Sequence, residues 1–294
     1  MKHGLRVLLL VALGCTGALG QKPRPCSTCL DWYKAQTPFR IFGNTYYVGT
    51  RGLSSVLITS SKGHVLIDGG MKESAGLIAR QIEQFGFHVR DVKVIVNSHV
   101  HYDHAGGIAD LQRRSGARVV ASEWSAAVLK HGGVAKDDPQ YGTLPPIAAV
   151  KSVSTFRNGE PLAVGDLTLT PHITAGHTPG GTSWTWRSCE GEVCHDMVFA
   201  DSLNPVSSPG FRFSTNNQYP QAIADFEKSF AFLETVPCDY LITAHPELSG
   251  ILVHWKLRLN GVKPDPMLDP GACRALAGSF REKLRQRLAE EGQP

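Results

Sequence analysis

One short stretch, SHVHYDHAGG at residues 98–107, constrains this chain more than any other part of its 294 residues. It places His99, His101, Asp103 and His104 within six positions. Imidazoles packed this closely without a metal would repel one another when protonated. Zinc binds imidazole nitrogen and carboxylate oxygen, so the cluster predicts a metal site. The stretch directly follows VKVIVN, an apolar run typical of a strand buried on both faces.

The direction of the side chains divides this cluster in two. In an extended segment, residues two apart point to the same side, so His99 and His101 can bind one metal. Asp103 continues that parity and His104 breaks it, so the chain must turn there and aim both side chains elsewhere. Glycines at 106–107 permit such a turn. The intervening tyrosine at 102 is expected to pack or to form the lip of a groove.

Two further histidines follow apolar, strand-like runs. His177 lies in AGHTPGG after LTLTPHITA, and His245 lies in AHPE after YLIT. If these strands lie side by side, their ends converge on one edge of a sheet, where α/β proteins commonly place their sites. One three-nitrogen site then consists of His99, His101 and His177, and a second site consists of Asp103, His104 and His245.

The number of ligands indicates what such a centre does. Structural zinc sites are closed by four protein ligands, whereas catalytic sites have three and keep a position open for water. Three ligands per ion therefore predict a dinuclear zinc enzyme, with two Zn²⁺ per chain, rather than a non-catalytic secreted zinc protein.

The remaining sequence alternates strand and helix patterns. Hairpin signals lie at Gly43-Asn44 and Ser61-Lys62-Gly63. Further strands are expected at ARVVAS, from Leu162 to Thr174, at TSWTWRS, at DMVFADSL and at YLITA. Helices are expected over 77–85, 106–114, 223–233 and 276–288. Residues 131–147 and 203–217 are expected to be loops that wall a substrate groove. No repeat or linker divides the chain, which favours a single α/β domain with helices covering sheet faces.

The first twenty residues have the pattern of an export signal. Lys2 and Arg6 precede an apolar run at 8–13, and small residues lead to Gly20. The run is far shorter than the roughly 20 residues that span a bilayer, so we expect no stable membrane span. A lipid anchor at Cys15 is an alternative, although its flanking residues match a lipoprotein cleavage site poorly. We therefore expect residues 1–20 to be removed and 21–294 to form the domain, located in the periplasm or secreted.

Charge and cysteine content agree with export. Without Lys2 and Arg6 the formal net charge falls from +4 to +2, which does not favour nucleic-acid binding. Six cysteines remain, and an even number in an exported chain favours disulfides. Spacing suggests the pair Cys189–Cys194, the pair Cys238–Cys273 and, by default, the pair Cys26–Cys29. A zinc site made of cysteines is disfavoured because no second CxxC faces the first.

The motif HxHxDH with two later histidines resembles the metallo-β-lactamase fold superfamily over essentially the whole mature chain. The resemblance implies a four-layer αββα sandwich with the metals at one edge of its two sheets. It also implies that Asp68, in HVLIDGG, holds the free N–H of a metal-bound imidazole. The alternative is that Asp68 caps the turn at Gly69-Gly70.

Within the superfamily, the chain resembles the exported dizinc enzymes of the third subclass of class B β-lactamases. The resemblance rests on His104 as a ligand of the second zinc, on AGHTPGGTSWTW and FADSL, and on Cys238–Cys273 as that subclass's disulfide. Ser202 stands near the place where the other subclasses have a cysteine ligand. Asn204 stands where this subclass often has a hydroxyl residue that helps to bind the substrate carboxylate. The resemblance therefore implies substrate contacts by Ser202 and Asn204.

The same resemblance implies an activity. It is zinc-dependent hydrolysis of the β-lactam amide of penicillins, cephalosporins and carbapenems by a hydroxide that bridges the two ions, giving antibiotic resistance. Asp103 is then also a catalytic residue, because it would orient this hydroxide. We expect a monomer whose partner is a small β-lactam, with no nucleic-acid partner. The alternative is another dizinc hydrolase of this fold, a lactonase or thioesterase, in which Asp201 would bridge the metals; Ser202 and its neighbours favour a non-bridging Asp201.

Overall fold

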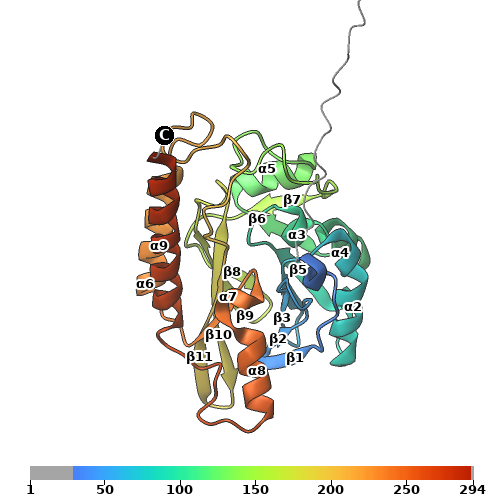
Figure 1. The fold of residues 1–294 in the computed structure, drawn as a ribbon. Helices are drawn as coiled ribbons and strands as arrows, with labels where there is room; N and C mark the ends of the chain where they lie inside the picture. Colours follow the sequence, from blue (N-terminus) through green and yellow to red (C-terminus); the bar gives the residue numbers. More distant parts are fainter. Residues whose placement is uncertain (1–28, 293–294) are drawn as a thin grey trace, which may run out of the picture.

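Two β-sheets lie face to face, and helices cover the outer face of each (Figure 1). The computed structural model describes residues 29–292. One outer layer consists of α6 (Ala222–Thr235) and α9 (Ala272–Gly292), and the other of α2 (Ala75–Gln84), α4 (Ile108–Ser115) and α5 (Glu123–His131). The expected αββα sandwich is confirmed.

The first sheet has the strand order β1-β2-β3-β4-β5-β6-β7. Its strands are β1 (Phe39–Phe42), β2 (Thr45–Tyr47), β3 (Val56–Ile58), β4 (His64–Ile67), β5 (Val92–Val96), β6 (Arg118–Ala121) and β7 (Val153–Thr155). From β1 to β4 the neighbours are antiparallel, as both hairpin signals predicted, and from β4 to β7 they are parallel. The carboxyl ends of β4 and β5 therefore lie at the same edge.

The second sheet has the strand order β12-β11-β10-β9-β8. Its strands are β8 (Leu162–Val164), β9 (Leu167–Ile173), β10 (Thr182–Glu190), β11 (Val193–Ala200) and β12 (Tyr240–Thr243). Both β9 and β11 run antiparallel to β10, and β12 runs parallel to β11. The carboxyl ends of β9, β11 and β12 thus also share one edge.

The strands before His177 and His245 do not lie side by side: β9 and β12 both belong to the second sheet but are not neighbours there, and β5, which precedes the segment 98–104, lies in the first sheet. The strand-rich run from Leu162 to Thr174 forms the hairpin β8–β9, in which Gly165 takes a left-handed φ of 65°.

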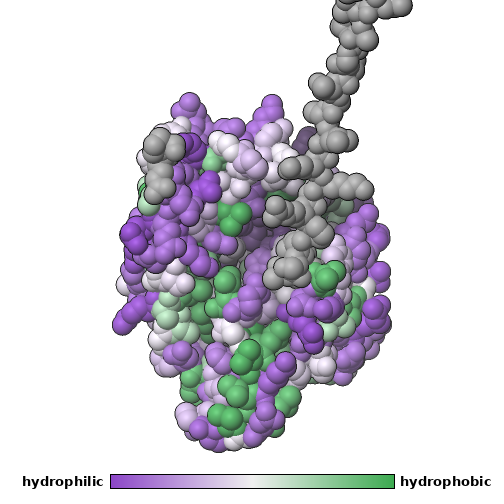
Figure 2. Space-filling model, in the orientation of Figure 1, coloured by the Kyte–Doolittle hydropathy of each residue, from purple (hydrophilic) through white to green (hydrophobic). Residues whose placement is uncertain are grey.

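Several short elements lie outside the expected helices and strands. They are α1 (Cys29–Trp32), α3 (Tyr102–Ala105), α7 (Pro246–Ser249), α8 (Ile251–Leu259), the single 3₁₀ turns at Lys72–Ser74 and Val89–Asp91, and the helix α5 and strand β7 described above. Helix α8 carries exposed apolar side chains, including Val253 and Leu259, and forms part of the apolar surface at the lower end of Figure 2. None of the described helices is long and apolar enough to cross a membrane.

Apolar side chains fill each interface between the layers. Large aromatic rings, Tyr47, Trp184 and Phe199, are fully buried between the two sheets. Outside the second sheet, the expected stripes of α6 and α9 meet, with Phe230 and Phe280 both buried there. These interfaces fix the sheets relative to each other and so fix the shared edge at which the strands end.

Two of the three expected disulfides are confirmed. Cys189–Cys194 closes the hairpin between β10 and β11, and Cys238–Cys273 joins the segment before β12 to α9. The proposed pair Cys26–Cys29 and the export signal at 1–20 lie outside the residues whose side chains the structure describes.

Candidate metal centre and substrate groove

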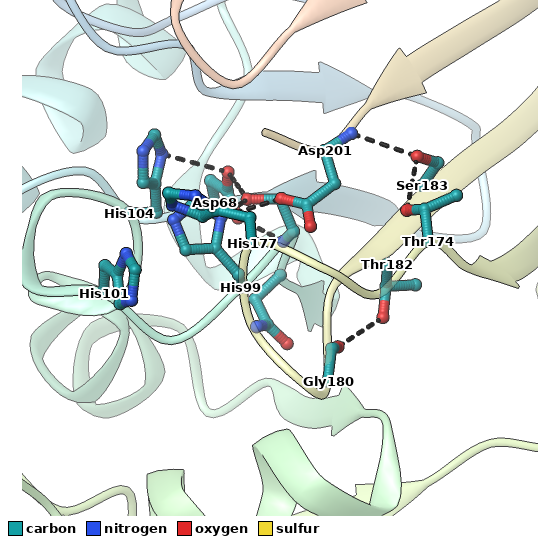
Figure 3. A network of polar contacts seen from close by, with 12 residues as sticks. Asp68, His99, His101, His104, Thr174, His177, Gly180, Thr182, Ser183 and Asp201 are labelled. Carbon is teal, nitrogen blue, oxygen red and sulfur yellow. Dashed lines mark hydrogen bonds and ion pairs between the residues drawn. The ribbon is translucent and has the colours of Figure 1, made fainter. Parts of the chain in front are cut away.

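Five strand ends meet at one edge of the sandwich and carry the polar side chains singled out in the sequence. Figure 3 shows six of these side chains: Asp68, His99, His101, His104, His177 and Asp201. From the first sheet, Asp68 follows β4, and the segment 98–104 follows β5. From the second sheet, His177 follows β9, Asp201 follows β11 and His245 follows β12. The structure therefore brings all six predicted ligands together, from two sheets instead of one.

His99, His101 and His177 form a compact trio. Their ring centroids are 4.6, 4.8 and 4.9 Å apart, and the rings stand at steep angles to one another. One ring nitrogen of each of these three histidines is already occupied. Asp201 Oδ1 lies 2.7 Å from His99 Nδ1, Asp138 Oδ2 lies 2.9 Å from His101 Nε2, and the Asn204 carbonyl lies 2.7 Å from His177 Nδ1.

This pattern leaves His99 Nε2, His101 Nδ1 and His177 Nε2 available to a metal. The trio has ligand atoms within 4.8 Å of one another. Metal-bound histidines usually donate their second N–H to a carboxylate or a carbonyl, which fixes the ring and its tautomer. All three imidazoles have such an acceptor here, so the trio has the arrangement of a site with three nitrogen ligands.

Asp103, His104 and His245 form the second trio. His104 Nε2 lies 3.1 Å from His245 Nε2 and 3.4 Å from Asp103 Oδ2, and His245 Nε2 lies 3.6 Å from the same oxygen. Tetrahedral zinc with bonds of about 2.0–2.2 Å separates its ligand atoms by roughly 3.3–3.6 Å. The two separations to the Asp103 oxygen fall in that range, and the separation between the two imidazole nitrogens is 0.2 Å shorter. His99 lies close enough to make a ligand group with Asp103 and His104 as well, which places the two trios side by side.

The electrostatics of the cluster favour a bound cation. Burial and the neighbouring imidazoles lower the pKa of His99 well below its usual value, and burial lowers the pKa of His177 to about 3 and of His245 to about 4. These rings are therefore neutral, as metal ligands must be. Burial also acts on His104, but the Asp103 carboxylate outweighs it and raises the pKa of His104 to about 10. A positive charge beside Asp103, from a proton or a metal, is thus stabilised, and the residues fit zinc.

Asp68 combines a holding role with an unusual backbone. Its carboxylate accepts hydrogen bonds of 2.7 Å from both the backbone N–H and the hydroxyl of Ser98. Its Oδ2 also lies 3.6 Å from His104 Nδ1, a buried nitrogen with no hydrogen-bond partner among the described residues. Its φ of 60° is the only left-handed value at a non-glycine residue in the described chain. Asp68 therefore fixes the start of the ligand segment and faces the imidazole of His104 without a hydrogen bond to it.

Asp201 lies behind His99. It is fully buried, its Oδ1 accepts from His99 Nδ1, and burial raises its pKa well above the usual value. Because it contacts His99 Nδ1, and not the ring nitrogen left available to a metal, Asp201 supports this imidazole.

The structure gives a different reason for the glycines at 106–107. Gly106 has φ −58° and Gly107 has φ −86°, values that any residue adopts, so no turn requires them. A Cβ on Gly107 would lie 2.2 Å from the Gly69 carbonyl oxygen, and one on Gly106 would lie 2.9 Å from the Lys72 nitrogen. The glycines permit close approach between the ligand segment and the segment that carries Asp68. The turn itself is the short helix α3, in which Asp103 and His104 lie.

A cavity of about 450 Å³ opens over the cluster. Both expected loops line it: Gln140 and Leu144 come from the first, and Asn204 and Val206 from the second. Also lining the cavity are the predicted substrate contact Ser202, the ligands His99, His101, Asp103, His177 and His245, and Trp32, Tyr102, Glu247 and Leu248. Tyr102 thus lines the groove and also packs against the apolar core.

Three residues at this groove escaped the sequence analysis. Asp138 is buried and holds His101, Gln140 Nε2 lies 3.4 Å from His101 Nδ1, and Trp32 lies over His245 with ring centroids 5.5 Å apart. Asp138 stood out only as an acidic position in a loop rich in glycine and proline. Nothing in the local sequence marks Gln140 or Trp32.

Comparison with known proteins identifies the family. The sequence matches the profile of the Metallo-beta-lactamase superfamily over residues 48–245, and the chain belongs to this superfamily. The solved structure of Rm3 metallo-beta-lactamase is 52% identical, with a TM-score of 0.89, and the match covers 92% of this chain and 100% of Rm3. MEM-A1, a subclass B3 metallo-beta-lactamase isolated from a soil metagenome library, is 47% identical, with a TM-score of 0.86, over 89% of this chain and 98% of that protein.

A more distant relative has another activity. The N-acyl homoserine lactonase AttM of Azorhizobium caulinodans is 29% identical to this chain over 54% of this chain and 70% of the lactonase. The similarity to subclass B3 structures is both higher and more complete, which agrees with the resemblance found in the motifs.

Proposed function

We propose that this protein is a zinc-dependent β-lactamase that hydrolyses the amide bond of β-lactam antibiotics. The observation that carries the proposal is the pair of ligand trios at the sheet edge, one compact group of three histidines and one formed by the contacts among Asp103, His104 and His245, in a chain 52% identical to Rm3 metallo-beta-lactamase over that protein's full length. The activity would give resistance to penicillins, cephalosporins and carbapenems.

The proposal includes two zinc ions per chain. The first is held by His99, His101 and His177, and the second by Asp103, His104 and His245. Bound zinc supplies a nucleophile from water at neutral pH and polarises the lactam carbonyl. Three protein ligands for each ion leave room for water and substrate.

The chain's own residues orient the reactants. With zinc bound, Asp103 would both serve as a ligand and accept a hydrogen bond that orients the attacking water. Among the described residues that line the groove there is no lysine or arginine, so neutral donors must complete the binding of the substrate carboxylate. Ser202, through its hydroxyl, and Asn204, through its side-chain amide, are at the groove and are our candidates.

A lactonase is the second candidate, and the similarity to AttM favours it. Against it stands Asp201, whose Oδ1 lies 2.7 Å from His99 Nδ1, on the side of the ring opposite the metal-facing nitrogen. An aspartate that bridges two metals would have to leave this contact.

Export to the periplasm or the medium, with removal of residues 1–20, is part of the proposal. Two disulfides support it, because disulfides persist in oxidising compartments. We also propose that the enzyme acts as a monomer.

The direct test measures hydrolysis of a chromogenic cephalosporin by the zinc-loaded protein, beside a penicillin, a carbapenem and an N-acyl homoserine lactone. We expect β-lactam hydrolysis that a chelator abolishes and zinc restores. Turnover of the lactone alone would replace the proposal with the second candidate. Metal analysis should give two zinc ions per chain, and a ratio of one would overturn the dinuclear assignment.

A further inference from the structure

The segment from Asp201 to Gln221 joins β11 to α6 without a helix or strand of its own. Its first part lines the groove through Ser202, Asn204 and Val206. A segment without a backbone ladder needs other contacts to hold a defined position. Such contacts come from the far end of the chain, in the last turns of α9.

Glu291, in the last turn of α9, binds the backbone of this segment. Its Oε1 accepts a hydrogen bond of 2.9 Å from the Phe213 N–H, and its Oε2 accepts one of 2.8 Å from the Ser214 N–H. The Glu291 side chain is only 4% exposed. A carboxylate buried at the end of a surface helix is unusual unless it is paired, and here it satisfies two consecutive backbone donors.

Arg287, one turn earlier, completes the contact. Its Nη2 donates to the Ser207 hydroxyl at 2.8 Å and to the Phe211 carbonyl at 3.0 Å, and its Nε donates to Glu291 Oε1 at 2.8 Å. The guanidinium thus binds both the segment and the carboxylate that holds it. Together, Arg287 and Glu291 engage four residues between 207 and 214.

The same segment reaches both walls of the groove. The Ser208 N–H and hydroxyl donate to the Pro139 carbonyl at 2.9 and 3.0 Å, next to Gln140 on the opposite loop. The Asn204 carbonyl accepts from the ligand His177. A displacement of residues 207–214 would therefore also move the cavity-lining residues Asn204, Val206 and Gln140.

Helix α9 is itself firmly placed. Its first turn is tied to the segment before β12 by Cys238–Cys273, and Arg281, in its middle, pairs with Glu227 and Glu234 of α6. Phe280 and Leu284 are buried against α6. The end of α9 is thus a fixed point from which a loop can be positioned.

We propose that Arg287 and Glu291 are positioning residues for the substrate groove: they hold residues 207–214 so that Asn204 and Val206 form its wall. This inference rests on the proposed function for the identity of the substrate. The contacts themselves do not depend on which substrate binds.

The test compares E291Q, E291A, R287A and R287K in the full-length enzyme. Glutamine offers only one acceptor oxygen, so in E291Q one of the two backbone N–H groups faces an amide N–H instead. We expect E291Q to behave almost like E291A, with KM for a chromogenic cephalosporin raised about five- to tenfold because a buried donor loses its acceptor. The value of kcat should stay within about twofold, since such an interaction acts on binding. R287K keeps the charge but loses the planar fork, and we expect it to resemble R287A.

The matched control is the ion pair Arg285–Glu282 of the same helix, which is exposed and makes no contact with the segment in the structure. E282Q and R285A should leave KM unchanged. Zinc content should equal that of the wild type in all six variants, and hydrogen exchange at the Phe213 and Ser214 amides should accelerate at least tenfold in E291Q but not in E282Q.

The outcomes separate the inference from the proposed function. Wild-type enzyme inactive on every β-lactam would overturn the function, and the amide exchange rates would still decide whether Glu291 holds the loop. Active wild type with unchanged KM and unchanged exchange in E291Q would overturn the inference. A variant that lost the fold would lower kcat and zinc content together. In that case R287K, which retains the charge, is the deciding variant: a raised KM would support the inference, and the KM of the wild type would overturn it.

Discussion

At the scale of single residues, the hydrogen-bond acceptors of the ligand histidines matter to zinc binding as well as the ligands themselves. Asp201, Asp138 and the Asn204 carbonyl each hold one ring nitrogen of the first trio. Such a partner fixes the ring, selects the tautomer and increases the basicity of the metal-facing nitrogen. The affinity for zinc should therefore depend on side chains that never touch the metal.

The variant D201N tests this dependence. Asparagine can still accept from His99, but without charge, and loss of such a partner typically reduces metal affinity about 10–100-fold. We expect a decrease in that range, measured by competition with a chromophoric chelator, with the fold retained. The matched control is D239N, because Asp239 Oδ2 holds His195 Nδ1 at 3.0 Å in a similar pair outside the metal cluster. Equal zinc affinity in D201N and the wild type would contradict the assigned role.

A substitution of Trp32 tests whether this groove binds the substrate. Its ring lies 5.5 Å from the His245 ring and 6.1 Å from the Tyr102 ring, and it lines the cavity. We expect W32A to raise KM about three- to tenfold, since an aromatic contact contributes about 0.5–1.5 kcal/mol beyond its buried area. In the control W255A, which removes a ring stacked on Phe39 at 4.7 Å, the melting temperature should fall while KM stays the same. If steady-state kinetics gave W32A the KM of the wild type, Trp32 would not contribute to substrate binding.

At the scale of elements, close backbone packing places the ligands. The start of α4 lies against the segment after β4, where the Gly107 N–H donates to the Gly70 carbonyl. Any side chain at position 107 must push these two segments apart, because its Cβ would meet the Gly69 carbonyl at 2.2 Å. Asp68 and the ligand helix α3 would then separate.

We expect G107A to destabilise the protein by about 1–3 kcal/mol through this overpacking and to weaken zinc binding. In the control G278A, we expect the stability to change in the opposite direction. Apart from the adjacent backbone of its own helix, no heavy atom lies within 4 Å of a Cβ at Gly278 of α9, so alanine should stabilise the helix by about 0.5–1 kcal/mol. Denaturant titration of the two variants measures both effects. A G107A protein as stable as the wild type would show that the segments can move apart at little cost.

At the scale of the whole molecule, the features that could be predicted from the sequence are those that depend on local sequence patterns. Each predicted ligand follows a strand directly or lies in one six-residue motif, so periodicity and spacing were enough to find it. The residues that support the site were not predictable in this way, because they contact partners far away in the sequence. Asp138 contacts His101, 37 residues away, and Glu291 contacts Phe213, 78 residues away. Those contacts depend on how loops lie on the finished sandwich. The assignment of strands to sheets also depends on such long-range packing, since a run such as LTLTPHITA does not indicate which of two sheets it joins.

The three apolar layers imply that the fold does not depend on zinc. Apolar side chains fill the space between the two sheets and the space outside each of them, and this packing requires no metal. Chelation should therefore abolish β-lactam hydrolysis while near-ultraviolet circular dichroism keeps its native form. Zinc binds the native state, so its removal lowers stability by mass action, about 2.7 kcal/mol when free zinc had been 100 times its Kd. For a chain of this size that corresponds to a fall in Tm of about 5–10 °C, which added zinc should reverse. Loss of the near-ultraviolet signal on chelation would mean that the metal cluster, and not the packing of the sheets, holds the two halves of the sandwich together.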